Sequence, residues 1–333
     1  SRSVCAQVLK SLPSSQAANA AAMIGSKTGI WALSRLRESP RTPFYMTQDF
    51  LSGRLRARTI LITGGSRGIG LAIAEACGRE GAILGLAARE SPALRDAARR
   101  VPGSTAFPAD LTNEDDVRAL FRSFQQRFKR LDVLVNSAGV FTYKPFMKIN
   151  RTEWDRNLAT NLTALYSVTR GALPLLKRGS APQIVNMLSI SSRTAFPNCA
   201  AYCASKFGAL GFTRVIAQEL RPLGIRVTAI LPGSTSTRMS GEFDFPVDRA
   251  KLLQPEDVAQ AVLTALLQPC RGVVDEIFLT PAAGNLSARS GSKEHAPAGA
   301  ARSRKAHHRQ SADLRSGPRV RSIGHESNGG DKR

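Results

Sequence analysis

The chain contains 333 residues, of which 42% are apolar and 22% charged, and it carries a formal net charge of +22. This composition allows a sizeable core, and the length fits one open α/β domain or two smaller domains. All four histidines follow residue 286, which excludes histidine-dependent hydrolysis and histidine-ligated metal in the middle of the chain.

The two ends differ from the middle and hold more than half of the excess positive charge. Residues 1–57, with Glu38 and Asp49 as their only acids, have the Ser-, Ala- and Arg-rich composition of an organelle transit peptide or of a disordered extension. Residues 286–333 have almost no large apolar side chains, so we expect a disordered basic tail there. The expected division is therefore 1–57, 58–285 and 286–333.

The cysteines and the apolar runs indicate the compartment. The five cysteines form no C-x-x-C pair and no regular framework, which favours unpaired thiols in a reducing compartment. No run approaches 18 consecutive apolar residues, so we expect no membrane span. A cytoplasmic protein is predicted, or one of an organelle matrix if residues 1–57 are a transit peptide.

Between the ends, short β-rich runs alternate with amphipathic stretches. Strands are expected at Thr59–Thr63, Ala82–Ala88, Leu131–Asn136, Gln183–Leu188, Ile225–Leu231 and Val273–Leu279. Helices are expected at Gly68–Glu80, Glu114–Lys129, Thr152–Lys177, Ala200–Pro222 and Pro255–Gln268. This alternation predicts a single-domain, doubly wound parallel sheet of the α/β class, the Rossmann fold.

The first expected strand runs directly into a glycine-rich turn and then into a helix. The turn reads Thr63-Gly64-Gly65-Ser66-Arg67-Gly68-Ile69-Gly70. Glycines let the backbone approach a pyrophosphate closely, and the helix N-terminus supplies unpaired N–H groups and partial positive charge. The sequence therefore predicts nucleotide binding here.

This T-G-x-x-x-G-x-G spacing resembles the short-chain dehydrogenase/reductase family, and further motifs agree in order and spacing over residues 58–285. Asn136-Ser137-Ala138-Gly139 looks like the family's N-N-A-G, with Ser137 in place of the second Asn. Ser189 lies 13 residues before Tyr202, and Tyr202 to Lys206 reads Y-x-x-x-K. Pro232 to Thr237 reads P-G-x-x-x-T.

The resemblance implies an NAD(P)-dependent oxidoreductase that needs no metal and acts on a small carbonyl or alcohol substrate. The implied catalytic set is Asn161, Ser189, Tyr202 and Lys206, with Asn161 holding a water relay behind Lys206. Cofactor contacts are implied for Gly64, Ser66, Arg67, Gly68, Ile69, Gly70, Arg89, Asp110, Leu111, Asn136, Ala138, Gly139, Tyr202, Lys206, Pro232, Gly233, Thr235 and Thr237. Among these, Asp110 follows the family's third strand and matches the acid that meets the adenine amino group.

The residue types suit this chemistry. Tyr202 and Lys206 are four apart in an expected helix and so share a face. A phenol has a pKa near 10, and we expect the Lys206 ammonium, with an oxidised nicotinamide ring, to lower the pKa of Tyr202. Tyr202 then gives a proton to a carbonyl oxygen, or takes one in reverse, while Ser189 hydrogen-bonds the same oxygen.

The cofactor prediction is NADP(H). In the family, NAD-preferring members place an Asp at the end of the second strand, and the matching position here is Ala88, followed by Arg89. Arg67 in the glycine loop is a second guanidinium that can reach a 2′-phosphate.

Substrate and partners are less defined. The pocket is expected from the loop after Ser189, the segment near Phe141–Phe146, and the stretch Arg238–Leu253, which contains Phe243 and Phe245. A homo-oligomer, tetramer or dimer, is implied through the helices Thr152–Lys177 and Ala200–Pro222.

Two alternatives remain open at this stage. The first is a 3-oxoacyl reductase acting on acyl carrier protein, which a basic surface would suit and for which Arg221 lies near an arginine of such members. The short segment before Pro255 and the ending Asp275 to Pro281 argue against it. The second is a non-catalytic dinucleotide-binding protein that uses its basic tails on nucleic acid, against which the intact Ser–Tyr–Lys set argues.

Overall fold

The computed structural model describes residues 53–243, 245 and 247–285, and the fold below concerns these residues. The expected transit-like segment up to residue 52 and the expected tail 286–333 lie outside them. Within the described part, no helix is long and apolar enough to cross a membrane.

Seven parallel strands form one sheet in the order β3-β2-β1-β4-β5-β6-β7. They are β1 (Thr59–Thr63), β2 (Ile83–Ala88), β3 (Ser104–Pro108), β4 (Val133–Asn136), β5 (Gln183–Met187), β6 (Arg226–Pro232) and β7 (Glu276–Leu279). The central strands β1, β4 and β5 are buried at every position, because helices cover both faces of the sheet. The predicted doubly wound Rossmann fold is confirmed.

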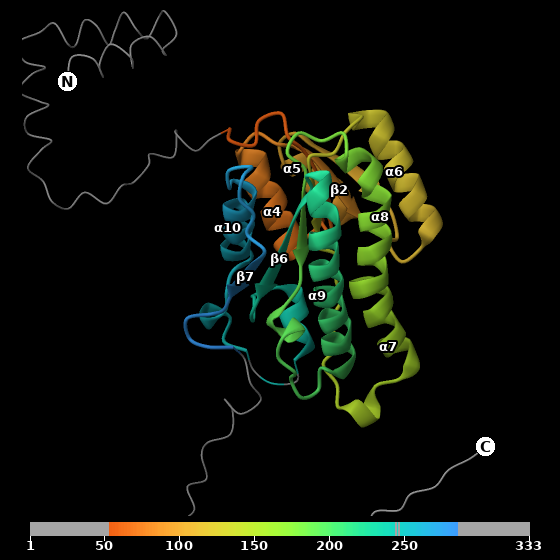
Figure 1. Cartoon of the computed structure of the whole chain (residues 1–333). Coiled ribbons are helices and arrows are strands. Elements are labelled where there is room, and N and C mark those ends of the chain that lie inside the picture. Colours follow the sequence, from red (N-terminus) through yellow and green to blue (C-terminus); the bar gives the residue numbers. More distant parts are fainter. Residues whose placement is uncertain (1–52, 244, 246, 286–333) are drawn as a thin grey trace, which may run out of the picture. The chain divides into compact units, whose positions relative to one another are not determined.

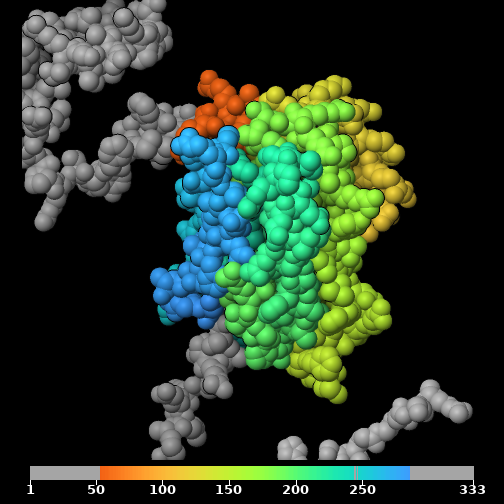
Figure 2. All heavy atoms as spheres, viewed as in Figure 1, coloured from red at the N-terminus to blue at the C-terminus, as the bar shows by residue number. Residues whose placement is uncertain are grey.

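The helices form two layers, one on each face of the sheet (Figure 1). They are α4 (Gly68–Arg79), α5 (Pro92–Arg100), α6 (Glu114–Phe128), α7 (Arg151–Leu158), α8 (Ala164–Leu176), α9 (Ala200–Leu220) and α10 (Pro255–Leu266). Residues of α4, α5 and α10 share one hydrophobic core with the sheet, and residues of α6, α8 and α9 share the other. In the space-filling view α8 and α9 run along the surface as neighbouring columns (Figure 2).

The apolar pattern does not predict two of these elements. Strand β3 has only one fully buried position, Phe107, because it lies at the edge of the sheet. Helix α5 is nine residues long and carries three arginines, with only Leu94 and Ala97 buried. Both are too short and too polar to produce a clear apolar run.

The expected helix Thr152–Lys177 is interrupted. Helix α7 passes into a π-helical turn at Ala159–Thr163, and α8 begins at Ala164. Asn161, one of the residues that the family resemblance singles out, lies inside this turn. Such single π-turns are frequent at functional sites.

The folded part begins earlier than the expected boundary at Arg58. Leu55 is fully buried in the core beneath α4 and α10, and its N–H donates to the carbonyl of Glu80 at 3.1 Å. The Arg58 N–H donates back to the Leu55 carbonyl at 3.0 Å, so the turn before β1 is fixed at both ends.

We predict that a fragment of residues 53–285 is more stable than one of residues 58–285, by about 2–5 kcal/mol in free energy of unfolding. The reason is the lost burial of Leu55, and Leu55→Ala in the longer fragment should reproduce most of the loss. Urea denaturation followed by circular dichroism measures it. Leu223→Ala is the control, since that side chain is half exposed and should cost less than about 0.5 kcal/mol. Equal midpoints and slopes for the two fragments would contradict the prediction.

Candidate active site

The glycine turn joins β1 to α4 at the carboxyl edge of the sheet. Gly64 and Gly68 adopt left-handed backbone angles, with φ of +68° and +55°. A Cβ on Gly64 would lie 2.9 Å from the Ala138 backbone, and one on Gly70 would lie 2.4 Å from the Gly64 carbonyl oxygen. Glycine is therefore required at both positions by the close approach of neighbouring backbone.

The N-terminus of α4 is suited to an anion. Arg67, an exposed residue, is the residue before the helix, and its side chain makes no capping hydrogen bond. The first turn of α4 contains no acidic residue. Ser66 and Ile69 flank this end and are half-buried. The helix dipole and N–H groups here favour a phosphate group, so these residues fit the pyrophosphate of a dinucleotide.

Thr63 fixes the loop after β4 against the glycine turn, a role that sequence reasoning missed. Its hydroxyl oxygen accepts hydrogen bonds from the N–H groups of Ser137 and Ala138, at 3.0 and 3.2 Å. The strand register places Thr63 beside Asn136. The threonine that opens the glycine motif was the only sequence signal for it.

A buried chain of polar side chains crosses the sheet from Asn136. Its amide nitrogen donates to Asn186 Oδ1 at 2.9 Å and to the Thr169 hydroxyl at 3.2 Å. The Asn186 amide nitrogen then donates to the Thr213 hydroxyl on α9 at 3.0 Å. Asn136 thus stabilises the strand ends and the helices that cover them.

The adenosine end of the site lies after β2 and β3. Ala88 ends β2 and the exposed Arg89 follows it. The carboxylate of Asp110 accepts hydrogen bonds from the Thr112 N–H and hydroxyl at 2.9 and 2.7 Å, and these bonds, with Arg89 nearby, lower its pKa. Leu111 is buried beside it.

The carboxylate of Glu90, which could neutralise the neighbouring Arg89, pairs with another arginine instead. The pairing is with Arg95 in the first turns of α5. Because Ala88 is neutral and Glu90 is paired with Arg95, Arg89 is the first unpaired charge after β2. The exposed Arg67 follows the neighbouring strand β1.

Ser189, Tyr202 and Lys206 meet after β5 and at the start of α9. All three are buried, with exposed fractions of 8%, 8% and 5%. Ser189 lies close enough to the Tyr202 phenol to lower its pKa, and Lys206 Nζ lies 5.8 Å from the centre of the tyrosine ring. Lys206 Nζ also donates to the Met187 carbonyl at 3.0 Å. The neighbouring Ser191 and Ser192 are buried in the turn after β5.

In the protein without cofactor the pKa of Tyr202 is raised, whereas the lowering is expected for the complex with an oxidised nicotinamide ring. Burial raises the pKa of Tyr202 to about 12, against an opposing effect of the hydrogen bond from Ser189. Burial also lowers the pKa of Lys206 to about 8. The spacing of the two residues correctly predicts a shared face, but desolvation is the largest cause of both pKa shifts.

Asn161 is held in place by the backbone of the β4 loop. Its Oδ1 accepts from the Val140 N–H at 2.9 Å, and its Nδ2 donates to the Val140 carbonyl at 2.9 Å and to the Ser205 hydroxyl at 3.0 Å. Both amide hydrogens are therefore used within the protein. A Cβ on Gly139 would lie 3.3 Å from Asn161 Oδ1 and 3.9 Å from Lys206 Nζ, which places both side chains against the same glycine.

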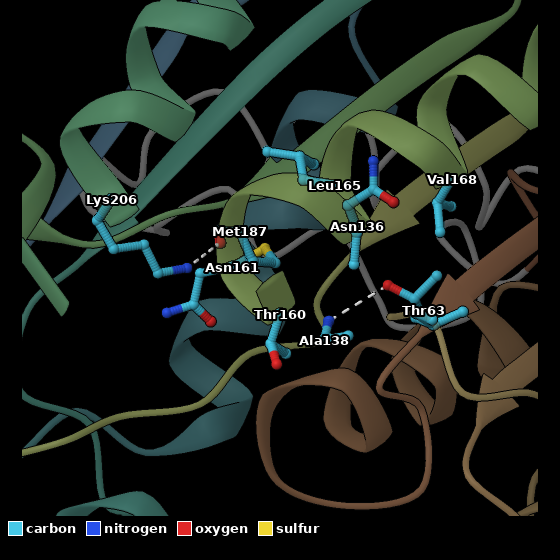
Figure 3. Close-up of a pocket in the computed structure, with 11 residues that line it drawn as sticks. Thr63, Asn136, Ala138, Thr160, Asn161, Leu165, Val168, Met187 and Lys206 are labelled. Carbon is cyan, nitrogen blue, oxygen red and sulfur yellow. Dashed lines mark hydrogen bonds between the residues drawn. The ribbon is translucent and has the colours of Figure 1, made fainter. Parts of the chain in front are cut away.

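A small cavity lies between these groups (Figure 3). Its volume is about 10 Å³, enough for about one water molecule. The polar residues that line it are Thr63, Asn136, Thr160, Asn161 and Lys206. In Figure 3 the Lys206 amine is directed at the Met187 carbonyl, and Asn161 lies next to it.

The P-G-x-x-x-T segment closes the other side of the site. Pro232 ends β6, and the Thr237 side chain lies 3.7 Å from where a Cβ on Gly68 would be, so this segment faces the glycine turn. The Thr235 hydroxyl donates to the Gly233 carbonyl at 3.0 Å. Beyond β7, Asn285 Oδ1 accepts from the Ser234 N–H at 3.2 Å and so fixes the segment from the other side.

Aromatic rings cover Tyr202. Phe141 meets it edge to face with ring centres 4.8 Å apart, and Phe243 lies 5.4 Å from Phe141. The two expected pocket segments, after β4 and after β6, are thus brought together. Phe146, by contrast, is 72% exposed. Among the described residues, no three His, Cys, Asp or Glu side chains gather as metal ligands.

The comparisons with known proteins agree with this geometry. The sequence model of the short chain dehydrogenases matches residues 58–245. The chain belongs to the short-chain dehydrogenase family. It is 33% identical over 229 residues to an uncharacterized oxidoreductase of Staphylococcus aureus (strain USA300), a match that covers 68% of this chain and 98% of that one. It is 32% identical over 238 residues to the sepiapterin reductase of Chlorobaculum tepidum, covering 68% and 97%.

Two solved short-chain dehydrogenase-like structures share the fold. One is an alcohol dehydrogenase from the archaeon Thermococcus sibiricus, complexed with 5-hydroxy-NADP, with a TM-score of 0.65, 25% identity, and coverage of 70% of this chain and 100% of that one. The other is a metagenomic short-chain oxidoreductase in complex with NADP, with a TM-score of 0.61, 30% identity, and coverage of 68% and 98%. As a short-chain dehydrogenase, the protein is an NAD(P)-dependent oxidoreductase.

We predict that Lys206 titrates near pH 8, more than two units below an ordinary lysine, because its burial disfavours the ammonium form. Carbon-13 NMR of the lysine Cε signals across pH 6–11 measures this midpoint. Lys206→Met should remove the early-titrating signal and identify it. Lys177→Met, which removes an exposed lysine at the end of α8, is the control and should leave that signal in place. A Lys206 midpoint near 10.5 would contradict the prediction.

Proposed function

We propose that this short-chain dehydrogenase is an NADP-dependent carbonyl reductase, acting on a small ketone or aldehyde, or on the alcohol in the reverse direction. The observation that carries the proposal is the buried Tyr202 phenol, with the buried Ser189 beside it and Lys206 Nζ 5.8 Å from its ring. These groups lie at the same edge of the sheet as the glycine turn.

Bound NADPH would supply the hydride that reaches the carbonyl carbon. In the proposed step the Tyr202 hydroxyl gives its proton to the carbonyl oxygen, and the Ser189 hydroxyl donates a hydrogen bond to the same oxygen. Lys206, with one N–H on the Met187 carbonyl, has two further N–H groups for the ribose hydroxyls of the cofactor.

The raised pKa of Tyr202 suits its proposed role as the proton donor in reduction. With a pKa of about 12, the phenol keeps its proton at neutral pH and is therefore ready as an acid. Alcohol oxidation needs the phenolate, so it depends on whatever lowers that pKa in the cofactor complex. The cavity beside Asn161 and Lys206, with room for about one water molecule, supports a route by which Tyr202 regains its proton.

The proposed NADP preference rests on the charges after β1 and β2. Arg67 and Arg89 are both exposed at the cofactor edge, and Ala88 offers no carboxylate to repel a 2′-phosphate. Two solved structures that resemble this chain hold NADP or a derivative of it. Charge-assisted hydrogen bonds of guanidinium to phosphate contribute about 1.5–3 kcal/mol each.

We also propose that the protein forms a homo-oligomer through α8 and α9. These helices carry three of the large apolar side chains that are exposed, namely Tyr166, Phe207 and Val215, at 43%, 44% and 51%. No observation favours acyl carrier protein as a partner, and Arg221 pairs with Asp275 at 3.1 Å.

We predict that Tyr202→Phe lowers the turnover of carbonyl reduction by about 100-fold or more, because the ring and its packing remain while the proton donor is lost. NADPH binding, followed by quenching of its fluorescence or by calorimetry, should change little. Tyr166→Phe is the matched control, since that tyrosine is exposed on α8 and should leave turnover unchanged. Near-normal turnover in Tyr202→Phe would refute the proposed mechanism.

We predict that NADPH is preferred over NADH by at least about tenfold in kcat/KM, or 1.4 kcal/mol. Ala88→Asp combined with Arg89→Leu should reverse the order, because a carboxylate then takes the ribose hydroxyls and repels the 2′-phosphate. Arg100→Leu, at an exposed arginine of α5 that pairs with Glu75, is the control and should leave the ratio unchanged. Equal use of both cofactors by the natural sequence would show that neither Arg67 nor Arg89 recognises the phosphate.

A further inference from the structure

We propose that the substrate is an uncharged ketone or aldehyde that carries an aromatic ring, and that this ring packs among the four aromatic side chains next to Tyr202. The four, called here the aromatic cluster, are Phe141, Tyr143, Phe243 and Phe245. The inference rests on the proposed function and assigns its substrate class.

The aromatic cluster is built from two segments that are about a hundred residues apart in the sequence. Phe141 and Tyr143 follow β4, and Phe243 and Phe245 follow β6. Across the segments the ring centres of Tyr143 and Phe243 are 5.1 Å apart, and those of Tyr143 and Phe245 are 5.9 Å apart. Within the second segment Phe243 and Phe245 are 5.1 Å apart.

The aromatic cluster adjoins the reacting group. Phe141 packs its ring against the ring of Tyr202 at 90° and 4.8 Å. Any carbonyl whose oxygen reaches the Tyr202 hydroxyl therefore places its substituents close to Phe141 and to the rings behind it. Only Phe141 of the four is fully buried, while Tyr143, Phe243 and Phe245 keep part of their surface accessible.

Most pairs of rings in the cluster have planes inclined by 60° or more. Three of the rings also keep accessible surface that another aromatic ring can contact. The Tyr143 contacts with Phe243 and Phe245 are edge to face, at 65° and 76°. A planar aromatic ring gains from such contacts beyond its buried area, and a saturated ring of the same size gains only from burial. The geometry thus favours an aryl group over an alkyl group.

Two cations on the loops around the site are paired with acids. Lys144, next to Tyr143 in the chain, pairs with Glu153 at 2.7 Å, and Arg193 after β5 pairs with Glu276. Of the described cations on the second segment, Arg238 and Arg249 are exposed to solvent. An anionic substrate group buried in the cluster would lack a counter-charge, which is costly.

Phenylacetone and cyclohexylacetone test the inference, because they differ only in whether the ring is aromatic. In both, a methylene group separates the ring from the ketone, so the intrinsic reactivity of the carbonyl is nearly the same. With saturating NADPH, we expect kcat/KM of the full chain to be about fivefold to tenfold higher for phenylacetone.

Variants of the cluster show whether the rings are the cause. Phe243→Leu and Tyr143→Leu keep apolar bulk, and each should lower the ratio of the two kcat/KM values by about threefold; the double variant should bring it near one. Phe146→Leu is the matched control, since Phe146 is on the same loop as Tyr143 but 72% exposed, and it should leave the ratio unchanged. Thermal unfolding confirms that each variant is folded.

The affinity for amides that are not reduced tests the ring preference independently of turnover. Phenylacetamide and cyclohexylacetamide present the same two rings beside a carbonyl that is not reduced. Calorimetry of the protein with NADP should give a lower Kd for the aryl amide, by a factor similar to that of the ketones, and Phe243→Leu should reduce that factor.

The possible failures are distinguishable. If neither ketone nor any other carbonyl is reduced with NADPH, the proposed function itself is wrong. If both ketones are reduced equally and Phe243→Leu leaves the ratio unchanged, the function stands and the aromatic inference is overturned. The inference is also overturned if phenylpyruvate is preferred over phenylacetone by more than tenfold and Arg249→Leu abolishes that preference, because the substrate would then be an anion.

Discussion

The site depends on the parallel pairing of β1, β4, β5 and β6, because strands that run the same way end at the same edge of the sheet. In this register Thr63, Asn136 and Asn186 lie side by side at the ends of three neighbouring strands. The glycine turn, the β4 loop and the Ser189 turn follow within a few residues. Each loop therefore starts from a fixed point, and the chemistry-bearing side chains converge although they come from distant parts of the sequence.

Burial determines the charge states at that edge. Tyr202 and Lys206 are almost fully buried, the tyrosine against Phe141 of the aromatic cluster and the lysine against the β4 loop. Both groups are shifted toward their neutral forms, the tyrosine to a higher pKa and the lysine to a lower one. A neutral phenol beside a lysine near its titration point can release and regain a proton without leaving an isolated charge in the core.

The sequence predicts the parts of the structure that depend on short-range pattern. The buried central strands are continuous apolar runs, and the glycine turn and the Tyr202–Lys206 pair are spaced as their local geometry requires. Edge strand β3 and helix α5 are missed because they bury few side chains. The placement of Thr63 under the β4 loop needs the strand register, which no local pattern contains.

The remaining gaps come from effects that are long-range. The raised pKa of Tyr202 in the protein alone does not follow from the sequence, because spacing along a helix indicates proximity and does not indicate burial. The burial of Leu55, which lies before the expected boundary at residue 58, does not follow from the sequence, because one apolar residue in a polar stretch does not indicate packing against α4 and α10. The aromatic segments are each visible in the sequence, but their mutual contact follows only from the fold.

The hydrogen bond from the Ser234 N–H to Asn285 has a consequence for the order in which the molecule assembles during synthesis. The glycine turn, the β4 loop and the Tyr202 helix are all translated before β7 emerges, and they can pack against the central strands early. The segment after β6 gains this contact only when residue 285 has left the ribosome. The nucleotide cradle is then formed first and the wall that faces it last, so a nascent chain passes through a stage in which the cradle is present but open on one side.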